Sequence, residues 1–237
     1  MRKFARVNDA AFTPSFPVTW AIIGLCTFFY LWSVINTFTY DSKVQAPFEQ
    51  AMMYETPLQK PAWMGYEPVL LGEPDVLVRP SFTQIVHGEV WRLFTPVLLH
   101  ANFLHILFNM LWLFALGRAM EPNMSKMGYI GFSLGGAALS NTCQYLVSGP
   151  FFVGYSGVLC AMLGYIWVRL KKAPWEPYLI NRRSLGFLWF FIFLLTLISG
   201  ALFVLSLYNV PGLRFPFANT AHMTGALYGL VVAKIKR

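Results

Sequence analysis

The 237-residue sequence is poor in charge, because Asp, Glu, Lys and Arg make up only 12% of it, whereas soluble domains carry about 25%. Acidic residues are scarcer than basic ones, with 10 against 18, and the net charge is +8. Three cysteines are too few for a disulfide scaffold. A hydrophobic content of 57% excludes a disordered chain and leaves too little polar surface for a soluble or nucleic-acid-binding domain. The composition predicts an all-α polytopic membrane protein.

Six apolar segments are long enough to cross a bilayer, whose hydrocarbon core needs roughly 20 apolar residues per helix. The predicted transmembrane helices cover residues 16–38, 94–116, 127–147, 154–170, 185–207 and 220–235. This pattern predicts a short N-terminal tail, residues 1–15, followed by one membrane domain over residues 16–237.

The basic residues predict the orientation, since Lys and Arg gather in cytoplasmic loops. Thirteen of the 18 lie on one side of the predicted helices, and seven of the ten acids lie on the other. We therefore expect both termini in the cytoplasm, and we attribute the positive charge to topology rather than to an acidic partner. The first segment is too long for a signal-peptide core and no small-residue cleavage site follows, so we expect it to be retained.

The predicted outer loop over residues 39–93 is unusually long and carries six prolines. Loops of this length are either disordered or functional. Its aromatic residues, which include Trp63, Tyr66 and Trp91, favour a packed element at the membrane interface.

Polar and ionisable residues inside membrane segments are costly and usually mark function. His105 and Asn109 are four residues apart in the second predicted helix, so they share one face. His100 lies five residues before His105, about 140° around a helix, and is expected to point elsewhere. Ser156 opens the fourth predicted helix and His222 begins the sixth.

The fourth helix is too short to bring Ser156 to the outer membrane surface, because 15 residues of helix extend about 22 Å. Its hydroxyl is therefore expected several Å below that surface, at a helix N-terminus where backbone N–H groups can stabilise an oxyanion. Gly157 on this helix, with Gly225 and Gly229 on the sixth, would allow a close approach of the two helices. Ser156 and His222 would then form a nucleophile–base pair.

Each of these features also has a simpler interpretation. Gly-x-Ser-Gly is common where helices begin, a lone membrane histidine can bond a neighbouring carbonyl, and Gly225 and Gly229 can serve packing alone. We expect no metal and no other cofactor, because the sequence has no His-Glu-x-x-His motif and no acid within the predicted helix interiors. A transporter would require broken helices or an inverted repeat, and we find neither.

Taken together, these motifs resemble those of the rhomboid intramembrane serine proteases. The matching elements are His100-x4-His105-x3-Asn109, Gly154-Tyr-Ser156-Gly157, Ala221-His222-x-x-Gly225-x-x-x-Gly229 and the pair Trp91-Arg92. They occur in the family's order and spacing from about His87 to Lys236. The resemblance implies a six-transmembrane-helix rhomboid-like bundle with a long first loop, acting without a cofactor.

The resemblance also implies a role for each residue. Ser156 is similar to the nucleophile and His222 to its general base and acid. His105 and Asn109 look like donors to the oxyanion, with His100 as an outer member of that cluster. The residues that match structural positions of the family near the site are Gly154, Gly157, Gly225, Gly229, Trp91 and Arg92.

The implied activity is hydrolysis of peptide bonds in or near transmembrane segments of membrane proteins, through an acyl-enzyme. The implied partners are transmembrane substrates and the lipid bilayer, and the implied location is the plasma membrane of a bacterium. One alternative stays open, a catalytically silent rhomboid-like protein that binds membrane clients. Cys160 stands where some members have a tyrosine that stacks on the catalytic histidine, so what orients His222 is open. Tyr155 and Phe151 are candidates.

Overall fold

The computed structural model describes residues 15–37, 47–55, 82–206 and 219–236, and in these ranges every regular element is helical. The long helices are α1 (Pro17–Thr37), α4 (Phe103–Met120), α5 (Lys126–Ser148), α6 (Ser156–Lys172), α7 (Arg182–Ser206) and α8 (Asn219–Ile235). The short ones are α2 (Pro47–Met52), α3 (Thr83–Val86) and the 3-10 turns η1 (Val90–Leu93), η2 (Thr95–Leu98) and η3 (Glu121–Asn123). Several predicted parts lie outside the described residues: 1–14 of the tail, 38 and 207 at the ends of the first and fifth predicted helices, 39–46 and 56–81 of the long loop, and 208–218 and 237.

The bounds of the long helices lie within four residues of the predicted ones, except at the start of the second predicted helix. That helix, α4, begins at Phe103 rather than at residue 94. Pro96 lies in the separate turn η2, and Asn102 caps α4 by accepting a 2.9 Å hydrogen bond from the backbone N–H of His105. The placement of His100 on this helix is therefore wrong, because His100 lies in the non-helical segment between η2 and α4.

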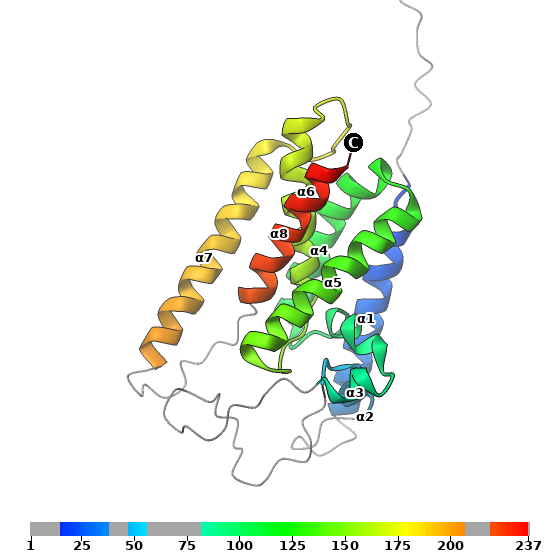
Figure 1. Cartoon of the computed structure of the whole chain (residues 1–237), viewed down its shortest axis with the longest axis vertical. Coiled ribbons are helices and arrows are strands. Elements are labelled where there is room, and N and C mark those ends of the chain that lie inside the picture. The colour runs from blue at the N-terminus through cyan, green and yellow to red at the C-terminus, as the bar shows by residue number, and fades with distance from the viewer. Residues whose placement is uncertain (1–14, 38–46, 56–81, 207–218, 237) are drawn as a thin grey trace, which may run out of the picture.

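Helix α6 lies at the centre of the bundle (Figure 1). It packs most extensively on α8 and also contacts α4, α5 and α7, while α1 packs on α4. Helix α7 stands at the side of the bundle, where it packs on α6 and its Phe187 and Phe191 rings contact Trp112 of α4. The first turn of α6 and the first turn of α8 thus lie next to each other inside the protein.

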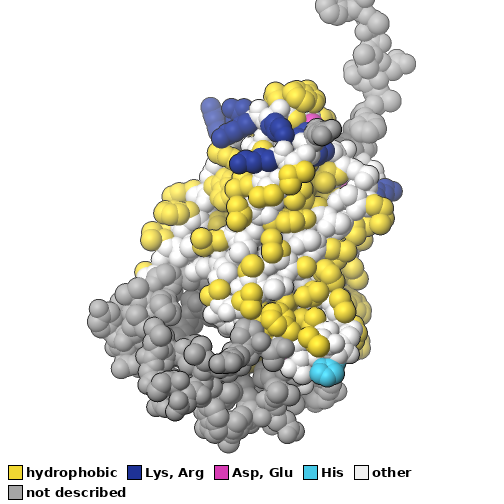
Figure 2. Space-filling view, viewed as in Figure 1, with side chains coloured by type: hydrophobic (Ala, Val, Ile, Leu, Met, Phe, Trp, Pro, Cys, Tyr) yellow, Lys and Arg dark blue, Asp and Glu magenta, His cyan; other side chains and the backbone are white. Residues whose placement is uncertain are grey.

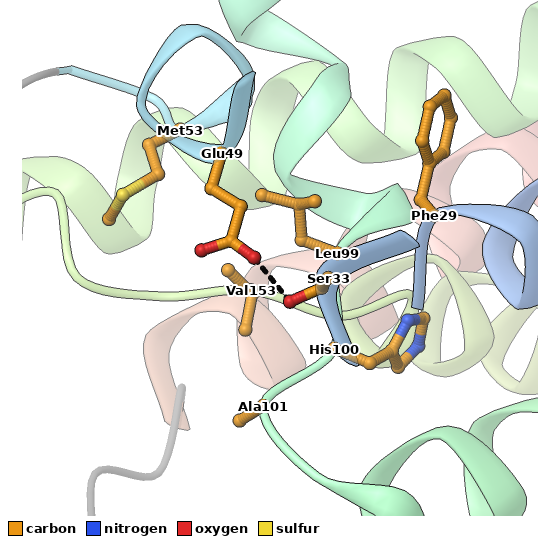
Figure 3. Close-up of a pocket in the computed structure, with 8 residues that line it drawn as sticks. All are labelled: Phe29, Ser33, Glu49, Met53, Leu99, His100, Ala101 and Val153. Carbon is orange, nitrogen blue, oxygen red and sulfur yellow. Dashed lines mark hydrogen bonds between the residues drawn. The ribbon is translucent and has the colours of Figure 1, made fainter. Parts of the chain in front are cut away.

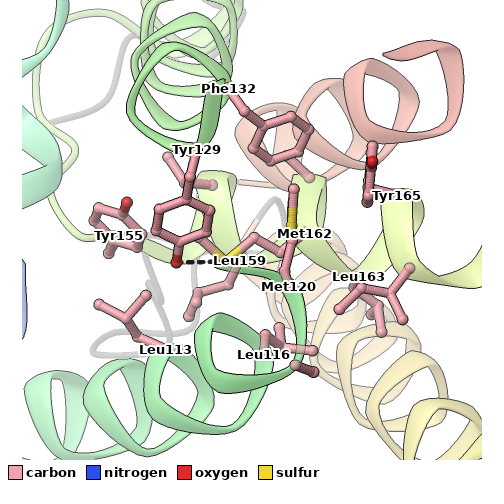
Figure 4. Close-up of a cluster of buried hydrophobic side chains, with 14 of the residues drawn as sticks. Leu113, Leu116, Met120, Tyr129, Phe132, Tyr155, Leu159, Met162, Leu163 and Tyr165 are labelled. Carbon is pink, nitrogen blue, oxygen red and sulfur yellow. Dashed lines mark hydrogen bonds between the residues drawn. The ribbon is translucent and has the colours of Figure 1, made fainter. Parts of the chain in front are cut away.

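The main core forms where α4, α5 and α6 meet (Figure 4). Its fully buried side chains include Leu113, Leu116, Met120, Tyr129, Met162, Leu163 and Tyr165. In a soluble protein, the burial of one such side chain away from water stabilises the fold by about 1.5–3 kcal/mol. In a bilayer, close packing supplies more of this stability. The core holds α6 in place along most of its length.

A buried carboxylate joins the start of α1 to the end of α4. Glu121 accepts hydrogen bonds from the backbone N–H groups of Val18 and Thr19, at 2.9 and 2.8 Å, and from the Thr19 hydroxyl at 2.7 Å. These donors satisfy both the carboxylate and the first N–H groups of α1, which lack partners within that helix.

The sides of the bundle are apolar, and the charges gather at one end (Figure 2). Large hydrophobic side chains are exposed along α1 and α7, among them Phe28, Leu31, Phe190, Phe193 and Leu197. Among the described residues, two helical stretches are long and apolar enough to cross a membrane, Pro17–Asn36 and Phe103–Asn123. An apolar belt next to a basic end is the surface expected of a membrane protein.

Candidate active site

Ser156 and His222 are directly hydrogen-bonded. The Nε2 atom of His222 lies 2.8 Å from the Oγ atom of Ser156, although 66 residues separate them in the chain. Ser156 is the first residue of α6, and His222 is the fourth residue of α8. Both side chains are partly exposed. A serine within hydrogen-bonding distance of an imidazole is the arrangement of an activated nucleophile and its base.

Glycines allow this approach of α6 and α8. A Cβ atom at Gly225 would overlap the carbonyl oxygen of Gly157, and one at Gly229 would overlap the carbonyl oxygen of Ala161. The two backbones therefore touch directly, as small residues permit in membrane bundles. The contact of Gly157 with Gly225 lies beside Ser156 and His222, so it sets the distance between them.

His105 lies against the segment that precedes Ser156. Gly154 has a φ of +114°, which residues with a side chain rarely adopt, and a Cβ atom there would lie 2.7 Å from the Cε1 and Nε2 atoms of His105. On its other side the ring accepts a hydrogen bond from the backbone N–H of Ala101, with 3.5 Å between nitrogen and Nδ1. In the neutral ring the proton is therefore assigned to Nε2, which faces the site.

Asn109 lies one turn after His105 on α4 and is buried. Its Nδ2 atom donates to the backbone carbonyl of His105 at 2.8 Å. The same atom lies 3.8 Å from the position that a Cβ atom of Gly154 would take. The amide nitrogen carries two hydrogens, so one donor remains for a group bound near Gly154.

His100 lies behind His105 and lines a separate cavity. The two rings meet edge to face with 5.2 Å between their centroids. His100 is buried, and neither ring nitrogen has a hydrogen-bond partner among the described residues. The adjoining cavity of about 240 Å³ is also lined by Ser33, Glu49 and Val153 (Figure 3), and Ser33 donates to Glu49. The walls of this cavity combine apolar side chains with the polar groups of Ser33, Glu49 and His100, and it is large enough to hold water.

Trp91 and Arg92 hold the α2 segment. The Nη1 atom of Arg92 donates to the backbone carbonyls of Gln50 and Met53, at 2.7 and 2.8 Å, and its Nε pairs with Glu89 at 2.6 Å. The Nε1 atom of Trp91 donates to the carbonyl of Ala51 at 3.1 Å. The two side chains thus attach α2 to η1.

One residue that the sequence analysis missed supports the start of α8. The Oε1 atom of Gln144, on α5, accepts a hydrogen bond from the backbone N–H of Ala221 at 3.0 Å, and this contact is buried. Ala221 directly precedes His222. A polar residue near the C-terminal end of the predicted third transmembrane helix was the signal in the sequence, but nothing there showed that it faces α8.

Neither Cys160 nor Tyr155 replaces the tyrosine discussed above. Cys160 is buried in α6, and Tyr155 belongs to the main core cluster with Tyr129 and Leu159 (Figure 4). The His222 ring is hydrogen-bonded to Ser156. The helix contact at Gly157 and Gly225 and the Gln144 hydrogen bond fix the backbone that carries the ring.

The arrangement combines a serine, a base and hydrogen-bond donors on the same side of the helix bundle. In the described ranges, no group of three or more His, Cys, Asp or Glu side chains is placed to hold a metal ion. These residues can carry out nucleophilic attack by Ser156 on a carbonyl group. The oxyanion formed from the carbonyl oxygen would lie near the Gly154–Ser156 backbone.

Comparison with known proteins identifies the fold family. Residues 87–237 match the model of the rhomboid domain. The chain is 34% identical over 166 residues to the rhomboid protease GlpG of Salmonella choleraesuis (strain SC-B67), covering 69% of this chain and 55% of that protein. It is 39% identical over 148 residues to the rhomboid protease GlpG of Enterobacter sp. (strain 638), covering 62% and 49%. The chain thus spans about half the length of these relatives.

Proposed function

Because the chain belongs to the rhomboid family, we propose that it is an intramembrane serine endopeptidase with Ser156 as nucleophile and His222 as general base. The observation that carries this proposal is the 2.8 Å hydrogen bond between their side chains. The relatives that the chain matches are named as rhomboid proteases, which supports the same reaction class.

The reaction begins when the Oγ atom of Ser156 attacks a substrate carbonyl carbon and its proton passes to Nε2 of His222. The resulting oxyanion receives hydrogen bonds from Nε2–H of His105, the free amide hydrogen of Asn109 and the backbone N–H of Ser156. Each such donor typically accelerates acyl transfer by ~10²–10³-fold in a water-poor site. The imidazolium of His222 then protonates the leaving amine, which leaves an acyl-enzyme on Ser156.

A water molecule completes the cycle by attacking the acyl carbonyl carbon while His222 takes the water proton. The bond between the acyl carbon and Oγ of Ser156 then breaks, His222 returns the proton to Oγ, and the carboxylic acid product is released. The cavity lined by His100 is a reservoir for this water, and it adjoins the site because the His100 ring contacts the His105 ring. Water in this cavity also provides hydrogen-bond partners for the buried ring nitrogens of His100.

All six long helices cross the membrane in this proposal, and both termini face the cytoplasm of a bacterium. Two features support the orientation. The basic residues gather at the end of the bundle that holds the C-terminus of α8 (Figure 2), and the site lies toward the opposite end. Ser156 and His222 then face the outer half of the plasma membrane.

Substrates are membrane proteins with a helix-breaking or small residue near the scissile bond. A regular helix buries its carbonyl groups in hydrogen bonds, so Ser156 reaches only a segment that unwinds easily. The alternative function, client binding without catalysis, requires neither the short distance between Ser156 and His222 nor the donors around Gly154.

Cleavage of a reconstituted substrate tests the proposal. The protein and a single-span model substrate, with a Gly-containing segment near its outer end, are placed together in liposomes. We expect cleavage by wild type and by the control Ser184→Ala, whose serine is exposed at the start of α7, and none by Ser156→Ala or His222→Ala. Undiminished cleavage by Ser156→Ala overturns the proposal. Substrate binding without cleavage by wild type supports the client-binding alternative instead.

A further inference from the structure

Positive charge is concentrated at one end of the bundle. Of the ten basic residues in the described ranges, nine lie at the end where α6 finishes and α7 begins (Figure 2). The described acids at the same end are Glu121 and Glu176. A charge imbalance of this size creates a field that attracts anions.

Neither of these acids is available to balance the other basic side chains. Glu121 is buried and accepts hydrogen bonds from Val18 and Thr19. Glu176 is bound by Arg169, by the Tyr178 hydroxyl at 2.6 Å and by Lys236 at 3.3 Å. Both carboxylates therefore serve internal contacts.

Three basic residues lie at the junction of α6 and α7, where α6 ends and α7 begins. Lys171, Arg182 and Arg183 are all exposed. Lys171 lies over the Trp167 ring at 4.6 Å, and Arg182 makes a long 3.4 Å contact with the carbonyl of Leu170. No acid faces any of the three among the described residues.

The two arginines also occupy an unfavourable position in their helix. They open α7, whose first turn contains no acid, and the N-terminus of a helix carries partial positive charge. An anion at this place would interact favourably with both arginines, whereas the first-turn N–H of Ser184 is already capped by the Asn181 side chain at 2.7 Å.

The loop beside the three basic residues carries exposed apolar side chains. Trp175 is 78% exposed and Leu179 is 51% exposed, within the connection between α6 and α7. Tryptophan is enriched where membrane helices pass from hydrocarbon to headgroups. The junction therefore combines a cationic centre with an apolar side chain suited to the interface.

We propose that Lys171, Arg182, Arg183 and Trp175 bind the headgroup of an anionic phospholipid in the cytoplasmic leaflet. The basic side chains contact the phosphate, and the Trp175 ring lies beside the upper acyl chain. This lipid site rests on the proposed orientation of the bundle but not on the catalytic activity of Ser156.

Quenching of tryptophan fluorescence by brominated lipid tests the proposal. The protein is reconstituted in phosphatidylcholine containing the same fraction of brominated phosphatidylglycerol or brominated phosphatidylcholine, and the Trp175 signal is the difference between wild type and Trp175→Phe. Because basic residues attract anionic lipid at the membrane surface, we expect about fivefold stronger quenching of Trp175 by the anionic lipid. Equal quenching by the two lipids overturns the proposal.

Charge variants separate a defined site from a general positive field. In the triple variant Lys171→Gln/Arg182→Gln/Arg183→Gln we expect the ratio of the two quenching signals to fall to about one. The matched control, Arg118→Gln/Lys126→Gln/Lys234→Gln, removes the same charge from exposed positions at the same end and should keep the wild-type ratio. Equal loss in both variants contradicts a site at the junction. Loss of the wild-type ratio in millimolar inorganic phosphate identifies a free-phosphate site instead.

Discussion

Gly157 and Gly225 bring α6 and α8 into direct backbone contact, because a methyl group at Gly225 would overlap the carbonyl oxygen of Gly157. Each glycine is a close neighbour of one member of the Ser156–His222 pair in sequence. The 2.8 Å hydrogen bond between Oγ and Nε2 is therefore a consequence of how closely the two helices pack.

Gly225→Ala should separate the two helices. Overpacking at a tight contact costs about 1–3 kcal/mol, and we expect a comparable loss in the free energy of unfolding together with a loss of activity. Unfolding in mixed micelles and cleavage of the liposome substrate measure the two effects. The control is Gly131→Ala on α5, where a Cβ atom meets nothing within 4 Å. Equal stability of the two variants would contradict the packing argument.

Gly154→Ala should impair catalysis more than stability. The substitution places a Cβ atom against His105 and forces a side chain into a φ of +114°. We expect kcat to fall by roughly 10²-fold, about the effect of losing one oxyanion donor. Gly149→Ala is a matched control, since Gly149 has a φ of +74° but no neighbour near its Cβ position. A similar loss of kcat in both variants would mean that backbone strain, and not the position of His105, is responsible.

Gln144→Ala should weaken the support of His222. The change leaves the buried N–H of Ala221 without its acceptor, which costs about 1–3 kcal/mol. We expect a lower kcat with little change in KM, because Gln144 does not touch the substrate. Gln144→Glu keeps an acceptor oxygen and should restore most of the rate. If both variants keep the wild-type kcat, then Gln144 does not position α8.

The Glu176 cluster predicts a stability change in acid. Burial raises the pKa of Glu176, but hydrogen bonds from Arg169 and Tyr178 and the charges of Lys236 and Arg169 outweigh it and lower the pKa from 4.5 to about 2. A group with a lowered folded-state pKa stabilises the protein above its unfolded-state pKa and loses that effect as the pH falls toward the folded-state value.

We therefore expect the stability of wild type to fall between pH 4.5 and about 2, whereas Glu176→Gln should lack this part of the fall. Thermal unfolding in detergent at a series of pH values measures the difference. Parallel curves for the two proteins would show that Glu176 is not stabilised as a carboxylate.

The sequence predicted the helix ends well where the length of the apolar run alone determines them. The ends of α1, α5 and α8 lie within one or two residues of their predicted positions, because polar residues or glycine follow each apolar run. It was wrong at the start of α4, where an apolar run continues through Pro96 and Leu99. There the missing N–H of proline and the cap at Asn102 outweigh hydrophobicity.

The candidate site was predictable in part. The short helix after Ser156 and the glycine spacing on α8 indicated that Ser156 and His222 lie at a similar depth. The position of His100 was not predictable, since it depends on a non-helical segment. Nor was the role of Gln144, because the amide contacts a backbone group 77 residues away and no local pattern encodes such a contact.

The central claim is that His222 activates Ser156, and labelling by a fluorophosphonate probe tests it without knowledge of the substrate. The purified protein in detergent is compared with Ser156→Ala and His222→Ala, with a soluble serine protease as positive control. We predict that wild type is labelled and that neither variant is. Labelling of Ser156→Ala at the wild-type level, or of the positive control alone, would contradict an activated serine at position 156.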